Sequence, residues 1–174
     1  MKKAALLVID MQVGALQLSN PRFHALDGVI ERLEKLIGRG RDKGVLICYA
    51  QHHNPDGFPT YGSSEWEIIP QIGPESQDIV VQKTTPDVFL NTALHEQLQE
   101  KNIGKLIIAG IQTADCIDTS CRRAFSLGYE VVLVKDGHTT FDSQNLRAEQ
   151  IIAHHNQIMA NWFGQVIESE KVVF

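Results

Sequence analysis

Short, unbroken apolar runs limit the folds open to this chain. Ala4–Ile9 ends at Asp10, and Leu106–Ala109 ends at Gly110. Each run is too short for a lone helix and has no polar alternation, so both indicate strands buried on both faces of a parallel sheet. The whole chain predicts strands at residues 4–9, 45–50, 78–82, 105–109, 131–135 and 165–168, and helices at 25–40, 91–102, 114–127 and 144–162. This alternation predicts a Rossmann-like, three-layer α/β/α sandwich with a six-stranded, mainly parallel sheet.

Length, charge and cysteine usage limit the partners that we expect. The 174 residues are most simply one domain, 1–174, and the net charge of −5 without a Lys/Arg-rich run argues against nucleic acid. No apolar segment approaches the roughly 18 residues that a membrane span needs. Met1–Lys3 leads into a strand and not into a signal peptide. Three cysteines, an odd number without C-x-x-C spacing, fit a reducing cytoplasm better than a disulfide framework.

Three polar residues follow predicted strands and are candidates for a site. Asp10 follows the first strand, Lys83 the third, and Cys116 lies just past the fourth. In open α/β sheets, ligands bind beyond the carboxyl ends of the strands, where the strand order reverses. We therefore expect these side chains to converge. Taken singly, each has a structural interpretation: a packed cysteine, a turn aspartate or a solvated lysine.

Cys116 is the candidate nucleophile, because it lies in the first turn after a strand-to-helix switch. Free backbone N–H groups and the positive end of the helix dipole meet there, and we expect them to lower the thiol pKa below its usual ~8.5. The same N–H groups can hold an oxyanion. Asp10 can act as general base, and Lys83 can supply positive charge to either partner.

Three motifs together resemble the isochorismatase-like cysteine hydrolases, a group that includes nicotinamidase and N-carbamoylsarcosine amidase. The motifs are Ile9–Gln12 after the first strand, Lys83–Phe89 after the third, and Gly110-Ile111-Gln112-Thr113-x-x-Cys116 after the fourth. The resemblance covers nearly the whole chain. It implies the strand order 3-2-1-4-5-6 and a catalytic triad of Asp10, Lys83 and Cys116.

The resemblance also implies an oxyanion hole. The Ile111–Gln112 peptide bond would be cis, and the N–H groups of Gln112 and Cys116 would bind the oxyanion. Gln12 would orient Asp10. One departure lies beside the nucleophile: many relatives carry an acidic residue where this chain has Ala114, and the acid follows at Asp115. We expect that carboxylate to point away from the sulfur or to bond to backbone.

A second departure concerns metal. Nicotinamidases bind a divalent ion through an Asp-x-His and further histidines, but here the stretch reads Tyr49-Ala50-Gln51-His52-His53. Two adjacent histidines without a third ligand make a poor site for zinc or iron. We therefore predict no metal and no other cofactor, and nicotinamide is disfavoured as a substrate.

Candidate substrate-binding residues come from loops. The long 51–76 segment is rich in Gly, Pro, Ser and aromatic residues, and loops of that length are usually functional. The substrate-binding candidates are Gln12, Leu16, His52, Trp66 and Phe89. The run Asp136–Thr140 also follows a strand, and we expect it to organise the helix that comes after it.

The sequence therefore predicts a metal-independent cysteine hydrolase. Its substrate would be a small non-peptide amide, imide or carbamoyl compound, cleaved at a C–N bond through a thioester. Two alternatives stay open: a thiol hydrolase for an ester or thioester, and a non-catalytic binding or assembly protein on the same fold. Isochorismate cleavage is disfavoured, because the family's vinyl-ether enzyme lacks the cysteine. The resemblance also implies a homodimer or homotetramer.

Overall fold

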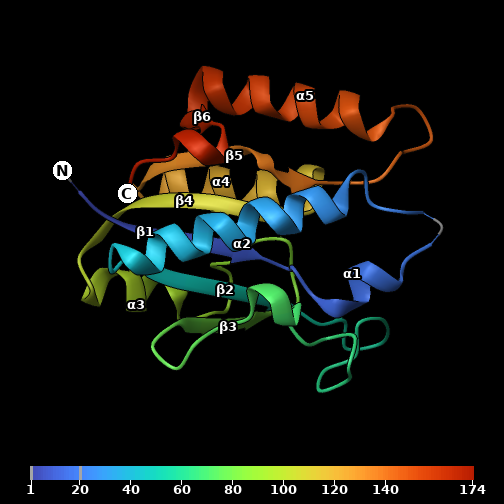
Figure 1. The fold of residues 1–174 in the computed structure, drawn as a ribbon, viewed down its shortest axis with the longest axis horizontal. Helices are drawn as coiled ribbons and strands as arrows, with labels where there is room; N and C mark the ends of the chain where they lie inside the picture. The colour runs from blue at the N-terminus through green and yellow to red at the C-terminus, as the bar shows by residue number, and fades with distance from the viewer. Residues whose placement is uncertain (1, 20) are drawn as a thin grey trace.

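The computed structural model describes residues 2–19 and 21–174, and its centre is a single parallel sheet (Figure 1). The sheet has six strands in the order β3-β2-β1-β4-β5-β6, and every neighbouring pair is parallel. The strands are β1 Lys3–Ile9, β2 Leu46–His52, β3 Ile79–Lys83, β4 Ile103–Ile111, β5 Glu130–Thr139 and β6 Gln165–Ile167. The predicted fold class and strand order are confirmed.

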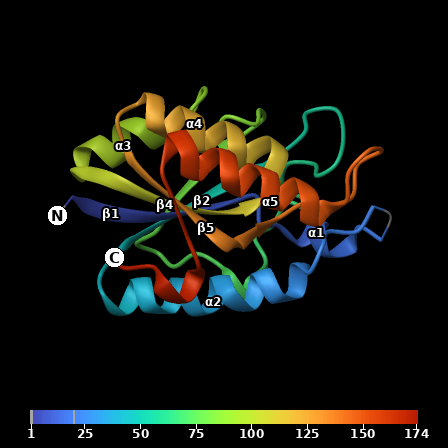
Figure 2. The same ribbon diagram turned by 90° about the horizontal axis from the view of Figure 1, so that it is seen from above.

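Helices cover both faces of this sheet (Figure 2). The helix α2 (Leu26–Asp42) lies on one face, and α3 (Leu94–Glu100), α4 (Asp118–Ser126) and α5 (Ala148–Ile158) lie on the other. The remaining turns are α1 (Val13–Gln17), the 3₁₀ turns η1 (Pro70–Ile72) and η4 (Ser169–Lys171), and the π-helical turns η2 (Thr113–Ile117) and η3 (Met159–Phe163).

Strand β1 is apolar after its first residue because both of its faces are buried. Ala5, Leu7 and Ile9 enter the core cluster under α3 and α4, whereas the alternate residues Leu6 and Val8 enter the cluster under α2. Side chains of a strand point alternately to its two faces, so a strand covered on both faces needs apolar residues at every position.

The structure differs from the predicted elements mainly beside the candidate site. The helix predicted at 114–127 is divided into the π turn η2 and α4, and the strand predicted at 131–135 continues to Thr139 as β5. The last helix begins at Ala148, not at residue 144, because the Asp142 carboxylate accepts a hydrogen bond from the Ala148 N–H at 2.7 Å. Among the described residues, no helix is both long and apolar enough to cross a membrane.

Candidate active site

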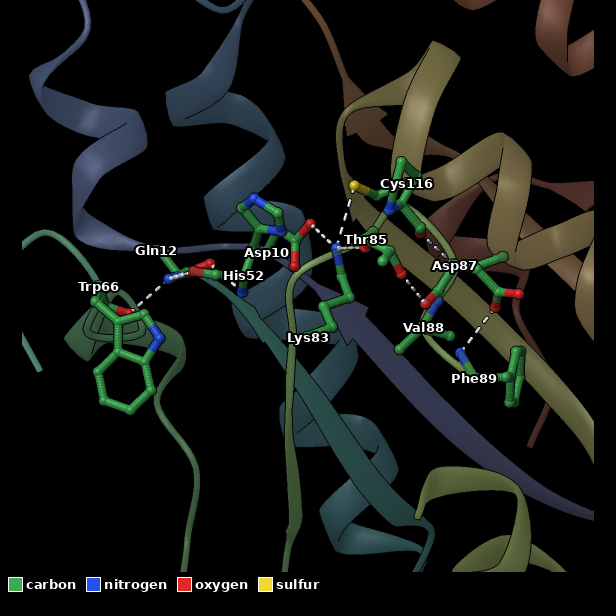
Figure 3. Close-up of polar contacts among 12 residues, drawn as sticks. Asp10, Gln12, His52, Trp66, Lys83, Thr85, Asp87, Val88, Phe89 and Cys116 are labelled. Atoms are coloured by element: carbon green, nitrogen blue, oxygen red, sulfur yellow. Dashed lines mark hydrogen bonds and ion pairs between the residues drawn. The ribbon is translucent and has the colours of Figure 1, made fainter. Parts of the chain in front are cut away.

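The side chains of Asp10, Lys83 and Cys116 meet at the carboxyl edge of the sheet (Figure 3). Lys83 Nζ donates to Asp10 Oδ2 at 2.6 Å and lies 3.2 Å from Cys116 Sγ. It also donates to the Thr85 carbonyl at 3.1 Å. Three sequence segments that are distant from one another are thus joined through one ammonium group. The convergence predicted from the strand ends is present in the fold.

Local backbone geometry brings each of these groups to the edge. Asp10 follows β1 with φ of 55°, so the chain turns away from the sheet at that residue. Lys83 is the last residue of β3, and Cys116 lies within η2. Gly110 in β4 has φ of 125° and passes so close to the Ile9 carbonyl that no Cβ would fit. Glycine is therefore required where β4 passes β1, just before the turn that carries Cys116.

Burial dominates the electrostatics of the Asp10–Lys83 pair. Lys83 is 2% exposed and Asp10 is 8% exposed. Burial raises the pKa of Asp10 above its ordinary value, although the Lys83 ammonium acts in the opposite direction. A carboxylate whose pKa is raised is a better proton acceptor, which is the property that a general base needs. Oδ1 of Asp10 has no hydrogen-bond partner among the described residues.

The prediction that the thiol pKa of Cys116 is lowered is wrong for this structure. Burial, together with the negative charge of Asp10, raises the pKa of Cys116 to about 12, and Lys83 offsets this only in part. The dipole argument considered the turn alone and did not include the carboxylate beside the sulfur. A thiol whose pKa is raised needs a base to become a nucleophile.

The turn before Cys116 has the backbone arrangement that an oxyanion hole would use. The Ile111–Gln112 peptide bond is cis. The N–H groups of Asp115 and Ile117 both donate to the Gln112 carbonyl. No acceptor is found for the Gln112 N–H among the described residues. An oxyanion hole formed by the N–H groups of Gln112 and Cys116 stays a prediction that this geometry permits.

A cavity of about 480 Å³ opens beside the thiol. It has an apolar wall and a polar floor. The wall is formed by Gly14, Ala15, Leu18, Pro21, Phe23, Phe58, Pro59, Pro86, Ile111 and Phe141. The polar lining residues are Asp10, Gln12, His52, Glu65, Gln112, Asp115 and Cys116. A volume of this order suits a small organic ligand.

Two of the five predicted substrate-binding residues line this cavity, Gln12 and His52, and the other three do not. Leu16 is 47% exposed and lies outside the lining. Phe89 is buried and stacks on Tyr129 with ring centroids 6.1 Å apart, and in Figure 3 it points away from Cys116. Trp66 packs against another aromatic ring of its own loop. These three positions were predicted from the loops and the motif in which they lie, and neither fixes where a side chain points.

Gln12 does not orient Asp10 through its side chain. Its Nε2 donates to the carbonyls of His52 and Trp66 at 2.9 and 2.7 Å, and its Oε1 accepts from the His52 N–H at 2.8 Å (Figure 3). Gln12 thus ties the end of β2 to the long loop. It shapes the cavity through the backbone and leaves the base free.

Sequence reasoning missed the three aromatic side chains of the cavity wall. Phe23, Phe58 and Phe141 come from three separate loops. A Phe-Pro pair in the long loop was a signal that could have been used, since Phe58–Pro59 is a cis peptide bond and both residues line the cavity. The other two rings have no local signal, because only the docking of their loops brings them together.

The cavity has an acidic character that the sequence did not predict. Asp115 is exposed and lines the cavity, and no hydrogen bond of its carboxylate is found among the described residues. Asp115 is not among the charges that shift the pKa of Cys116, so the expectation that its carboxylate points away from the sulfur stays a prediction. Glu65 lines the cavity as well. Lys83 is already engaged by Asp10, and no Lys or Arg appears among the described lining residues.

The two adjacent histidines diverge after β2. His52 lines the cavity, whereas His53 packs edge-on against Tyr61 with centroids 5.4 Å apart. Burial lowers the pKa of His52, and the nearby Lys83 charge acts in the same direction. Across the described part of the chain, no group of three or more His, Cys, Asp or Glu side chains could hold a metal ion. The donor set at this site does not fit a resident zinc or iron.

These observations define a class of protein: an α/β sandwich with a thiol, a carboxylate and an ammonium grouped at the carboxyl edge of a parallel sheet. The family model for the isochorismatase domain matches residues 4–170. A crystal structure of an isochorismatase family protein superposes with a TM-score of 0.90 at 32% identity, covering 97% of this chain and 99% of that one. The chain belongs to the isochorismatase family.

Characterised relatives are more distant. A streptothricin hydrolase of Streptomyces noursei is 30% identical over 139 residues, which cover 79% of this chain and 50% of that protein. The ureidoacrylate amidohydrolase RutB of Acinetobacter baylyi is 26% identical over 171 residues, which cover 78% of this chain and 70% of that protein. The chain thus spans half the length of this streptothricin hydrolase. These relatives are hydrolases, and the second is an amidohydrolase by name.

Proposed function

We propose that this protein is a metal-independent cysteine hydrolase that cleaves a C–N bond in a small non-peptide amide, imide or carbamoyl compound. The observation that carries the proposal is the Lys83 ammonium, which lies 2.6 Å from Asp10 Oδ2 and 3.2 Å from Cys116 Sγ beside a cavity of about 480 Å³. A nucleophile, a base and a charge that steadies both are the parts that acyl transfer needs.

The proposed mechanism begins with a neutral thiol. Asp10 takes the proton of Cys116 as the sulfur attacks the carbonyl carbon, and the N–H groups of Gln112 and Cys116 hold the oxyanion. The tetrahedral intermediate collapses when Asp10 returns the proton to the leaving nitrogen, so that ammonia or an amine departs. Water then gives a proton to Asp10 as its oxygen attacks the thioester carbonyl, and Asp10 returns that proton to the departing sulfur, which restores the thiol and the ionised Asp10. Lys83 favours the ionised form of Asp10, the form that accepts a proton from the thiol and later from water.

The residues that line the cavity limit the charge that a substrate can carry. Three phenyl rings offer an apolar surface, and Asp115 and Glu65 add negative charge, while the described lining residues include no free cation. A substrate carboxylate would find no partner there and would be repelled. We therefore propose that the substrate is neutral or cationic. Hydrolysis of a C–N bond agrees with the name of the RutB relative.

The experiment is a screen of small amides for ammonia release, followed by mass spectrometry of the Cys116 peptide after acid quenching. Release that is accompanied by an acyl mass on Cys116 supports the proposal. If only esters or thioesters are turned over, the alternative of an ester or thioester hydrolase is favoured over C–N bond hydrolysis. If no compound is turned over and no acyl-enzyme forms, the non-catalytic alternative is favoured.

A charge series sharpens the screen. Matched amides that differ only in a neutral, ammonium or carboxylate substituent should show the carboxylate compound as the poorest substrate. Asp115→Asn should reduce the discrimination by roughly threefold, since an exposed charge pair contributes under about 1 kcal/mol. Equal turnover of all three amides would contradict the proposed charge preference.

Compartment and assembly stay proposals. Cys48, Cys116 and Cys121 are all free, and Cys48 and Cys121 are buried, which is compatible with a reducing cytoplasm. The expected homodimer or homotetramer can be tested by sedimentation equilibrium.

A further inference from the structure

A chain of buried polar groups lies behind the turn that carries Cys116. The Thr113 hydroxyl lies 2.9 Å from His138 Nδ1, and His138 Nε2 lies 3.0 Å from Asn156 Oδ1. Thr113 and His138 are 0% and 2% exposed. These residues come from the start of η2, from the far end of β5 and from α5, and none of them lines the cavity.

The direction of each hydrogen bond in this chain follows from its outer end. Asn156 Nδ2 donates to the Lys135 carbonyl at 3.3 Å, so Asn156 Oδ1 is the acceptor for His138 Nε2–H. Burial lowers the pKa of His138 to about 4, which keeps the imidazole neutral at physiological pH. Nδ1 of His138 is then unprotonated and accepts from the Thr113 hydroxyl. Each hydrogen bond in the chain therefore has one donor and one acceptor.

His155, which precedes Asn156 in α5, makes a second contact at the C-terminal end of the turn η2. His155 Nδ1 lies 3.0 Å from Asp118 Oδ1, and Asp118 directly follows η2. Arg122 donates to both oxygens of the same carboxylate at 2.7 and 3.0 Å. Although burial acts in the opposite direction, the hydrogen bonds from His155 and Arg122 hold the pKa of Asp118 below its ordinary value. Asp118 is therefore ionised and paired.

We propose that His155 and Asn156 of α5 hold the nucleophile turn at both ends, and that Thr113 and His138 are positioning residues for Cys116. This inference rests on the proposed function, because it concerns the geometry of acyl transfer to Cys116. The turn has a π-helical and not an α-helical path, so its own hydrogen bonds do not define it as firmly as those of a regular helix. The polar chains supply the missing constraint from outside the turn.

The probe for this proposal is 4-nitrophenyl acetate, which needs no knowledge of the natural substrate. Cys116 Sγ attacks the ester carbonyl, nitrophenolate leaves, and the thiol proton goes to Asp10. Thr113→Val keeps the shape of the side chain and removes the donor, whereas Thr113→Ser keeps the donor. Thr113→Val should slow the maximal acylation rate of Cys116 by about 10-fold to 100-fold through misplacement of the sulfur, with the half-saturating ester concentration unchanged. Thr113→Ser should restore most of the rate.

A matched control separates positioning from general stability. Tyr49→Phe also removes a buried hydroxyl, one that contacts Arg41 and the Gly73 carbonyl and does not line the cavity. It should lower the melting temperature without slowing acylation. Acylation of Thr113→Val at the wild-type rate, or a loss that Thr113→Ser does not restore, would overturn the proposal.

A double-mutant cycle tests whether the chain acts as one unit. Asn156→Ala should slow acylation in the same direction as Thr113→Val, and the double variant should be no slower than Thr113→Val alone. Losses that multiply would mean that Asn156 and Thr113 act independently, and the proposed chain would be wrong. If the wild-type Cys116 is acylated no faster than free cysteine at the same pH, the proposed function fails instead, and the two failures are distinguishable.

Discussion

The two sides of Cys116 are held by different kinds of interaction. Behind the thiol, Thr113, His138 and Thr140 are at most 3% exposed and hydrogen-bonded. In front of it, the cavity is walled by loop residues, and Phe58 on the 51–76 loop is 50% exposed. The rear is specified by buried hydrogen bonds that allow one arrangement, whereas the front is specified by apolar contacts that tolerate substitution. We infer that the reaction depends on the rear and that substrate choice depends on the front.

The test with the largest expected effect removes Cys116, the proposed nucleophile, which lies between the two sides. Cys116→Ala should lower turnover by at least about 10³-fold, because the other two cysteines, Cys48 and Cys121, are buried and do not line the described cavity, so neither could form the proposed thioester. The melting temperature should stay within a few degrees, since the side chain is partly exposed and small. Both are measured with the amide found in the ammonia screen and by calorimetry. A variant that keeps its activity but loses much of its stability would reassign Cys116 to packing.

Lys83→Met tests whether the buried ammonium between the two sides controls the charge of Asp10, the proposed base. The methionine fills a similar volume, but the ammonium beside Asp10 is lost, so we expect a decrease in kcat/KM of about 10²-fold to 10⁴-fold. Lys83 opposes the upward effect of burial on the pKa of Asp10. Its removal should raise that pKa further and move the acid limb of the pH–rate profile upward by about one pH unit or more. An acid limb that stays in place would contradict contact between the two charges in solution.

Phe58→Ala tests the front of the cavity. The ring is 50% exposed, so its loss should cost about 1 kcal/mol of substrate binding, which is roughly fivefold in KM. We expect kcat to stay near the wild-type value, because a phenyl ring has no group that could take part in the proton transfers. Tyr61→Ala is the matched control, since Tyr61 lies on the same loop, packs against Trp66 and does not line the cavity. A fall in kcat in Phe58→Ala alone would show that the front also positions the reaction.

The same contrast explains what could be predicted from the sequence. The reacting groups at the sheet edge could be predicted because Ala4–Ile9 and the run before Gly110 are central strands, and the residues at the ends of such strands share one edge. The positions of Asp10, Lys83 and Cys116 follow from that topology. The pKa of Cys116 did not follow, because it depends on burial beside a carboxylate that comes from another strand.

The front could not be predicted for a physical reason. Phe23, Phe58 and Phe141 enter the cavity from three loops whose docking depends on contacts throughout the fold, and loops carry no periodicity that shows which side faces inward. Phe89 illustrates the converse error. It lies in a motif of the site by sequence, yet its ring packs under the site against Tyr129.

The smallest effect is expected from removal of metal, which tests whether the front of the cavity holds a metal ion. His52 lines the cavity and His53 turns toward Tyr61, so the described residues offer no third ligand that would complete a metal site. Dialysis against EDTA should leave kcat/KM unchanged, and elemental analysis of the active protein should find no stoichiometric zinc or iron. A loss of activity that added metal restores, and that His52→Ala prevents, would show that the front supplies chemistry as well as shape. The division between a reactive rear and a selective front would then be wrong.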